Sequence, residues 1–287
     1  MEVNKMKTKH IAMGAIFTSL ILVLLVLGYV VPGIELLFMI FLPFLSSYIS
    51  FEFGLKKSLP FLVASIILSF LLSYINAILY VIPSLISGVC FGALGKRINK
   101  IIDLTFIMSF IEGFLFALSI IAISLLFGLD IQEDIASLIN MDSNRLNSNI
   151  YLFLFLIGLT QSTMTSVVII HNYHKLKLRN FEYQTGKIIF IFNIISILSM
   201  ISFFNNSQIL RLSYGVYFVT LIVQVFSSFT VKVKRNWIFS LIQIFTFLFI
   251  SIPLLTIIKN ELKLFVYSWF LIPLVIKNCF QVFKNNQ

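Results

Sequence analysis

The chain has 287 residues, of which 59% are hydrophobic and 11% are charged, against roughly 25% charged residues in an average soluble domain. A soluble fold of this length cannot bury so much apolar surface, so the composition excludes a soluble enzyme, a disordered chain and a disulfide scaffold. It predicts an all-α integral membrane protein, a polytopic transmembrane helix bundle. The net charge of +10 is spread in small groups between apolar runs, which favours contact with anionic lipid over nucleic-acid binding.

Ten apolar runs are separated by charged clusters or by Pro, Gly and Asn residues. Because a helix needs about 20 apolar residues to cross a bilayer, each run is a predicted membrane span. The predicted spans cover residues 11–31, 34–51, 59–75, 76–94, 102–128, 150–170, 188–204, 212–230, 237–258 and 264–281. The third and fourth are short and adjacent, so one tight hairpin, which leaves eight full spans, is the alternative.

The basic residues are distributed unevenly between alternate loops. One set of loops, together with both chain ends, carries 17 Lys and Arg residues, whereas the other set carries 4, namely Arg145, Arg211, Lys259 and Lys263. Basic residues accumulate on the cytoplasmic side of membrane proteins. The distribution therefore predicts a multi-pass protein of the cell membrane with both termini in the cytoplasm.

The loop at residues 129–149 is acidic and lies on the predicted outer side. Ile131, Ile135, Leu138 and Ile139 repeat in it at helical spacing, with acidic residues on the other face. This pattern predicts an amphipathic helix on the outer membrane surface. Two interpretations remain open for it: a lid over an external pocket, or a connector resting on lipid.

Sequence signatures of catalysis are absent. The chain contains no HExxH, GxSxG or GxxxxGK[ST] pattern, and these patterns supply the metal site, the nucleophile or the phosphate loop of common enzymes. We therefore expect no enzyme activity, no cofactor and no metal, and we interpret His171 and His174 as part of a solvated loop at the membrane border. Gly88 and Gly92 form a GxxxG pair, which allows two helix backbones to approach closely.

Glu112 is an acidic residue inside the predicted fifth span. It lies about 11 residues, or ~16 Å, from the cytoplasmic end, and an ionised carboxylate at that depth costs at least ~2.5–3.5 kcal/mol. Gln161 lies at a similar depth in the sixth span. Two interpretations remain open: a hydrogen-bonded clasp between the two side chains, or a binding site for a solute or a proton. Glu35 and Asn76, near the outer ends of their spans, either face an external cavity or contact lipid headgroups.

The first six predicted spans carry an ordered series of short motifs. In chain order these are Gly14, Ala15, Thr18 and Ser19; Pro32; Pro43 within 41–45; Gly54 before Lys56 and Lys57; and Ser87, Gly88 and Gly92 before Gly95, Lys96 and Arg97. This order resembles the YybS-like family of bacterial membrane proteins of unknown function. That family is in turn similar to the substrate-binding S components of energy-coupling factor vitamin transporters.

The resemblance implies a division of the chain and a partner. It covers about residues 5–180 and implies an S-component-like six-span membrane domain at 1–180, followed by a C-terminal four-span membrane region at 181–287. In S components, small residues four apart on the first span contact the partner subunit that carries ATPase work. Ala15 and Ser19 match those positions.

The expected function is that of a small-solute-binding or transport-related membrane subunit in the bacterial cytoplasmic membrane. Its expected partners are the lipid bilayer, a small-molecule ligand and a membrane subunit or ATPase module, because no residue pattern in the chain can hydrolyse ATP. The alternative is a non-transporting membrane scaffold or assembly factor in cell-envelope or stress physiology. An intramembrane enzyme would need a paired acid and base or a nucleophile, and the sequence contains no such constellation.

Overall fold

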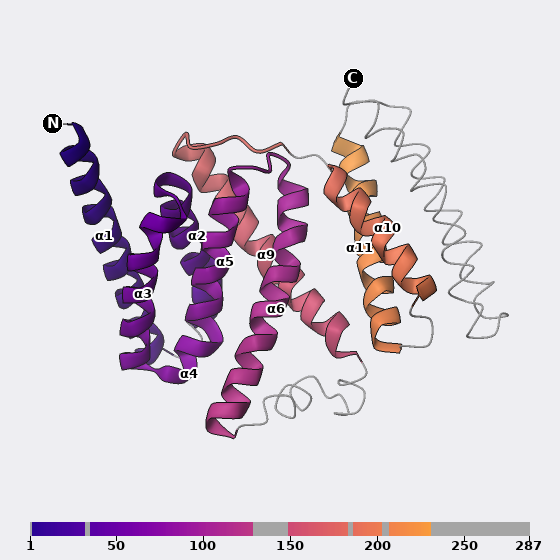
Figure 1. Cartoon of the computed structure of the whole chain (residues 1–287), viewed down its shortest axis with the longest axis horizontal. Helices are drawn as coiled ribbons and strands as arrows, with labels where there is room; N and C mark the ends of the chain where they lie inside the picture. The colour runs from indigo at the N-terminus through magenta and orange to yellow at the C-terminus, as the bar shows by residue number, and fades with distance from the viewer. Residues whose placement is uncertain (1, 32–34, 129–148, 183–185, 203–206, 231–287) are drawn as a thin grey trace. The chain divides into compact units, whose positions relative to one another are not determined.

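The computed structural model describes residues 2–31, 35–128, 149–182, 186–202 and 207–230, and these are helical apart from short turns (Figure 1). The helical elements are α1 (Glu2–Val30), α2 (Glu35–Phe53), α3 (Leu55–Leu72), α4 (Tyr74–Asn76), the π-helical segment η1 (Ala77–Val81), α5 (Ile82–Gly95), α6 (Ile101–Phe127), α9 (Ile150–Lys175), α10 (Lys187–Ser202) and α11 (Ser207–Thr230). The chain divides into two compact units, Met1–Glu182 and Tyr183–Gln287.

Five helical segments in the described part of the chain are long and apolar enough to cross a membrane. They are Ile11–Gly28, Leu55–Leu72, Tyr74–Gly95, Ile101–Phe127 and Ile150–Lys175. Phe38–Phe53 in α2 and Lys187–Ser196 in α10 are shorter apolar segments. The predicted all-helical architecture of a membrane protein is therefore confirmed for these residues.

The predicted spans 59–75 and 76–94 correspond to two separate segments, each with enough apolar length to cross a membrane. The predicted surface helix in the 129–149 loop falls almost entirely outside the described residues, as do the predicted spans 237–258 and 264–281.

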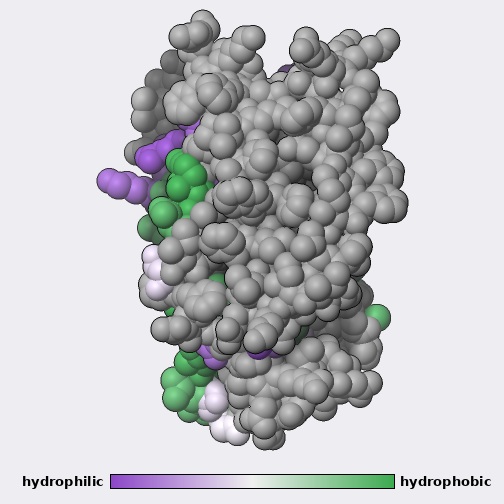
Figure 2. All heavy atoms as spheres, turned by 90° about the vertical axis from the view of Figure 1, so that its right-hand side faces the viewer, coloured by the Kyte–Doolittle hydropathy of each residue, from purple (hydrophilic) through white to green (hydrophobic). Residues whose placement is uncertain are grey.

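The described helices carry large apolar side chains on their outer surfaces. Leu71, Phe114 and Leu125 are examples, and Leu125 is 80% exposed. Along the left margin of Figure 2, hydrophobic and hydrophilic described residues both reach the surface. The exposed apolar side chains are suited to contact with lipid acyl chains, since these are as apolar as leucine.

Two glycines with positive φ stand at helix ends in the first unit. Gly54 joins α2 to α3 with a φ of 84°, and Gly128 ends α6 with a φ of 66°; these left-handed conformations favour glycine. Ser73 joins α3 to α4 in an extended conformation, and its hydroxyl accepts a hydrogen bond from the backbone N–H of Asn76 at 3.4 Å. This bond caps the new helix.

In the first unit, α5 packs closely against α2. A Cβ atom added at Gly88 would lie 2.0 Å from the Ser46 hydroxyl oxygen and 2.2 Å from the carbonyl oxygen of Pro43. At Gly92 it would lie 2.4 Å from the carbonyl oxygen of Ser47. The absence of side chains at both glycines therefore sets the distance between the two helices.

A second close crossing joins α6 to α9. A Cβ atom at Gly113 would lie 2.6 Å from the carbonyl oxygen of Leu154, and one at Gly158 would lie 2.0 Å from that of Ser109. The rings of Phe106, Phe110 and Phe155 pack beside this crossing, with centroids 5.0 to 5.9 Å apart. The glycine pair and the aromatic cluster together fix the rotation of α6 about its axis.

The second unit contains α10 and α11, which pack against each other. Ile189 on α10 and Val216 on α11 are buried. The Thr220 hydroxyl donates a hydrogen bond to the side-chain oxygen of Asn193, and both residues are fully buried. A polar pair of this kind ties two apolar helices together, since neither group has water available inside the bundle.

Candidate functional site

Glu112 is buried in the first unit, with only 2% of its surface exposed. It lies 11 residues after Ile101, the first residue of α6, or roughly 16 Å along the helix. The Ser87 hydroxyl on α5 donates a hydrogen bond to its Oε1 atom at 2.5 Å. The single acid in the middle of this apolar helix is thus held by the neighbouring helix.

Two buried polar atoms on α5 and α6 have no partner among the described residues. They are the second carboxyl oxygen of Glu112, Oε2, and the hydroxyl oxygen of Ser84. Ser84 and Ser87 are three residues apart and therefore share one face of α5. Because nearly all buried polar atoms in proteins are hydrogen-bonded, the α5–α6 contact has unused capacity for a polar ligand or a proton.

The backbone immediately before Ser84 departs from a regular α-helix. In η1 the N–H of Ile82 bonds to the carbonyl of Ala77, five residues earlier, and Pro83 follows without an N–H to donate. Single π-helical turns occur frequently at functional sites. Ser84 and Ser87 therefore lie within about a turn and a half of an irregular helical segment.

Gln161 is buried on α9, but the hydrogen bond that holds Glu112 comes from Ser87 on α5. Hydroxyl groups around Gln161 make other contacts. Ser166 shares a 2.7 Å hydrogen bond with Thr105 of α6, and Thr163 donates to the carbonyl of its own helix four residues earlier. The interhelical clasp that the sequence suggested between α6 and α9 is therefore found between α6 and α5.

Pro43 in the middle of α2 produces a polar contact that the sequence analysis missed. Proline has no N–H, so the carbonyl of Met39, four residues earlier, lacks its helical donor. The Thr165 hydroxyl of α9 donates to this carbonyl at 3.4 Å. In an apolar medium a freed carbonyl must find another donor, and α9 supplies it.

Of the two other polar residues proposed from the sequence, Asn76 lies apart from Glu112, and the side chain of Glu35 is outside what the structure describes. Glu35 is the first residue of α2. Asn76 ends α4, is half-buried, and lies 11 residues before Ser87, which corresponds to roughly 16 Å along the helical axis. The structure therefore does not bring Asn76 next to the Ser87–Glu112 pair.

Ala15 and Ser19 lie on an exposed face of α1. Gly14 is buried and packs against the ring of Phe61 on α3, where an added Cβ would lie 1.9 Å from a ring carbon. The Ser19 hydroxyl donates to the carbonyl of Ala15 at 2.9 Å, so its polar group is satisfied within the helix. This small-residue face is accessible to lipid or to another transmembrane helix.

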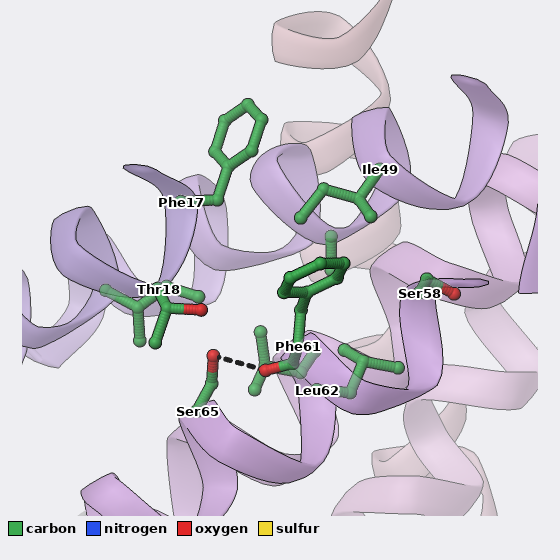
Figure 3. Close-up of a pocket in the computed structure, with 10 residues that line it drawn as sticks. Phe17, Thr18, Ile49, Ser58, Phe61, Leu62 and Ser65 are labelled. Carbon is green, nitrogen blue, oxygen red and sulfur yellow. Dashed lines mark hydrogen bonds between the residues drawn. The ribbon is translucent and has the colours of Figure 1, made fainter. Parts of the chain in front are cut away.

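A small cavity lies between α1, α2, α3 and α5, with Phe17, Ile49 and Leu62 among its walls (Figure 3). Its volume is about 10 Å³, the space of a single water molecule. The Ser65 hydroxyl beside it donates to the carbonyl of Phe61 at 2.8 Å, as Figure 3 shows. The cavity is too small for a solute.

Hydrogen bonds among Asn99, Arg179 and Glu182 join the segments that follow α5 and α9, and we call this polar cluster the latch. Asn99 donates through its side-chain nitrogen to the carboxylate of Glu182 at 2.7 Å, and the Glu182 N–H donates to the Asn99 carbonyl at 3.0 Å. Arg179 donates to the side chain of Asn99 and to the carbonyl of Gly95. The latch closes the first unit at its last residue.

His171 and His174 lie near this end of the unit. The His174 ring nitrogen Nδ1 is hydrogen-bonded to the side-chain oxygen of Asn180 at 2.8 Å, and His171 is exposed. Within the residues that the structure describes, no three His, Cys, Asp or Glu side chains lie close enough together to hold a metal ion.

Comparisons of the chain with protein-family models, with curated proteins and with solved structures gave no match.

Proposed function

We propose that the chain is a multi-pass membrane subunit that binds a small polar solute or a proton between α5 and α6. The observation that carries this proposal is the buried Glu112 carboxyl group, which has one oxygen bonded to Ser87 and the other without a partner among the described residues. An ionisable residue at membrane depth is a functional candidate by default because its burial is costly. The unpartnered Ser84 hydroxyl and the π-helical turn before it add support.

The proposal includes ten spans, cytoplasmic termini and a location in the bacterial cytoplasmic membrane. It rests on the uneven distribution of basic residues between alternate loops and on the resemblance to YybS-like proteins and S components. The same resemblance supports a separate energising partner, and the exposed Ala15 and Ser19 on α1 are its proposed contact face. Small residues allow such a partner helix to approach closely.

The second candidate is a non-transporting membrane scaffold or assembly factor. One observation favours it: the hydrogen bond from Ser87 to Glu112 joins two adjacent helices, which is also what a purely structural polar contact does in a membrane. In that case the carboxyl group would be protonated and would serve only to hold α5 against α6.

Mass spectrometry of the purified full-length protein tests the first candidate against the second. The wild-type protein in mild detergent is expected to release a small molecule on denaturation, and Glu112→Gln is expected to lose it without a change in melting temperature. The amide retains hydrogen-bonding capacity and removes the ionisable proton. Asp103→Asn, an equivalent change at another buried acid of α6, is the matched control and should retain the molecule.

Two outcomes contradict the solute-binding proposal. One is a wild-type protein that releases no small molecule and whose proton uptake, measured in detergent with a pH indicator, is the same as that of Glu112→Gln. The other is a Glu112→Gln protein that retains the molecule fully. Either result, together with co-purification of the same partner proteins by wild type and variant, supports the scaffold.

A further inference from the structure

A groove of about 830 Å³ lies at the end of the first unit where α2 passes into α3 and where α5 ends. Its mouth carries four exposed basic residues: Lys56 and Lys57 at the start of α3, and Lys96 and Arg97 after α5. No acidic residue is among the residues that line it. We call this feature the basic groove.

The walls of the basic groove are mostly apolar. Phe53 lies at the end of α2, Leu94 near the end of α5 and Ile111 on α6. Ile111 is ten residues from the start of α6, or roughly 15 Å along its axis. This depth corresponds to about half of the ~30 Å hydrocarbon core of a bilayer, which is the thickness of one leaflet.

The charges at the mouth are concentrated by the fold. The two lysines follow the tight turn at Gly54, and the other two basic residues leave the end of α5, so separate segments of the chain contribute to one site. The Lys96 ammonium lies 5.5 Å from the centre of the Phe51 ring, a cation–π contact that holds it at this end of α2. Glu52, the neighbouring acid on α2, is hydrogen-bonded to Tyr48.

We propose that the basic groove binds one anionic glycerophospholipid from the inner leaflet. The four basic side chains hold its phosphate, and an acyl chain lies along the wall formed by Phe53, Leu94 and Ile111. Basic sites between transmembrane helices on the cytoplasmic side bind anionic headgroups. The assignment to the inner leaflet rests on the proposed orientation, because the Lys and Arg distribution places this end of the unit in the cytoplasm.

Charge and shape together favour a lipid over other anions. A free phosphate or an acidic peptide would pair with the basic mouth but would leave the apolar wall without a matching group. A zwitterionic lipid would cover the wall, but it would bring its own positive charge to four cations. An anionic lipid satisfies both parts of the groove.

Native mass spectrometry of the full-length protein in detergent tests this proposal with phosphatidylglycerol and phosphatidylcholine of identical acyl chains. We expect wild type to retain phosphatidylglycerol at least fivefold better than phosphatidylcholine. The Lys56→Gln, Lys57→Gln, Lys96→Gln, Arg97→Gln variant should lose this preference. Lys175→Gln, Lys177→Gln removes two exposed basic residues that do not line the groove and should keep it.

A second variant keeps the test informative if the quadruple change impairs folding. Ala93 lines the groove on α5, and Ala93→Trp fills the apolar part while leaving all four cations. It should reduce phosphatidylglycerol retention at least fivefold with an unchanged melting temperature. Equal retention by wild type and both groove variants would overturn the proposal. So would equal displacement of the lipid by soluble glycerol phosphate, which would show a phosphate site without an acyl-chain component.

Discussion

Replacing Gly88 by alanine is expected to destabilise the first unit through the α2–α5 crossing. The new methyl group would lie 2.0 Å from the Ser46 hydroxyl oxygen and 2.2 Å from the carbonyl oxygen of Pro43. Hydroxyl rotation can relieve the first contact, but the second involves backbone. The two helices must therefore move apart.

The change in the free energy of unfolding caused by Gly88→Ala is the sum of two opposing effects. Inserting a methyl group into a tightly packed contact costs ~1–3 kcal/mol, and alanine in place of glycine inside a helix gains ~0.5–1 kcal/mol. The two ranges combine to a net loss of roughly 0–2.5 kcal/mol, centred on about 1.3 kcal/mol, in the free energy of unfolding for Gly88→Ala. Gly92→Ala, whose Cβ would lie 2.4 Å from the carbonyl of Ser47, should behave in the same way.

Gly95 provides a matched control on the same helix. A Cβ atom there would meet its nearest neighbour, a ring carbon of Phe181, at 3.6 Å, which is an ordinary contact distance. Gly95→Ala should therefore be neutral or slightly stabilising. The assay is unfolding of the purified protein in mixed detergent micelles by titration with dodecyl sulfate, followed by circular dichroism. If Gly88→Ala proves as stable as Gly95→Ala, the inference that glycine sets the α2–α5 distance is wrong.

Further predictions concern orientation, the α1 face and one interhelical hydrogen bond. Reporter fusions should report cytoplasm after Lys57 and the outside after Arg211, and the reverse result at either position would contradict the predicted orientation. The double change Ala15→Trp, Ser19→Trp should abolish co-purification of a membrane partner without lowering the melting temperature, because both residues are exposed; full retention of partners would contradict the contact face. Thr165→Val should lower the free energy of unfolding by about 0.6 kcal/mol, as is typical for hydrogen bonds between membrane helices, and a stabilising effect in the same dodecyl sulfate titration would contradict a contribution from this bond.

The helical architecture could be predicted because apolar length alone decides it. The predicted fifth span at 102–128 differs by one residue at each end from the observed α6, Ile101–Phe127. The first helix shows the limit of that reasoning: the apolar run begins at residue 11, but α1 begins at Glu2. Helical hydrogen bonding continues through Lys5 and Lys7 because these residues are good helix formers outside an apolar segment as well as inside one.

The partner of Glu112 could not be predicted in the same way. Counting residues along each span puts Gln161 and Glu112 at a similar depth in the membrane. Depth, however, does not give the direction in which a side chain points. That direction follows from the glycine crossing: Gly113 faces Gly158 on α9, and Glu112 precedes it by one residue, about 100° around the helix. Glu112 thereby faces α5, where the Ser87 hydroxyl donates a hydrogen bond to its carboxyl group.

The proline in α2 also has a consequence for the order of assembly. The Met39 carbonyl and the Thr165 hydroxyl that serves it are separated by 126 residues. At a synthesis rate of about 5–20 residues per second, α9 follows α2 from the ribosome by roughly 6–25 s. During that interval the Met39 carbonyl has no donor from its own helix, and its hydrogen bond with Thr165 forms only when α9 docks. Completion of the first unit is thus tied to the arrival of its last helix.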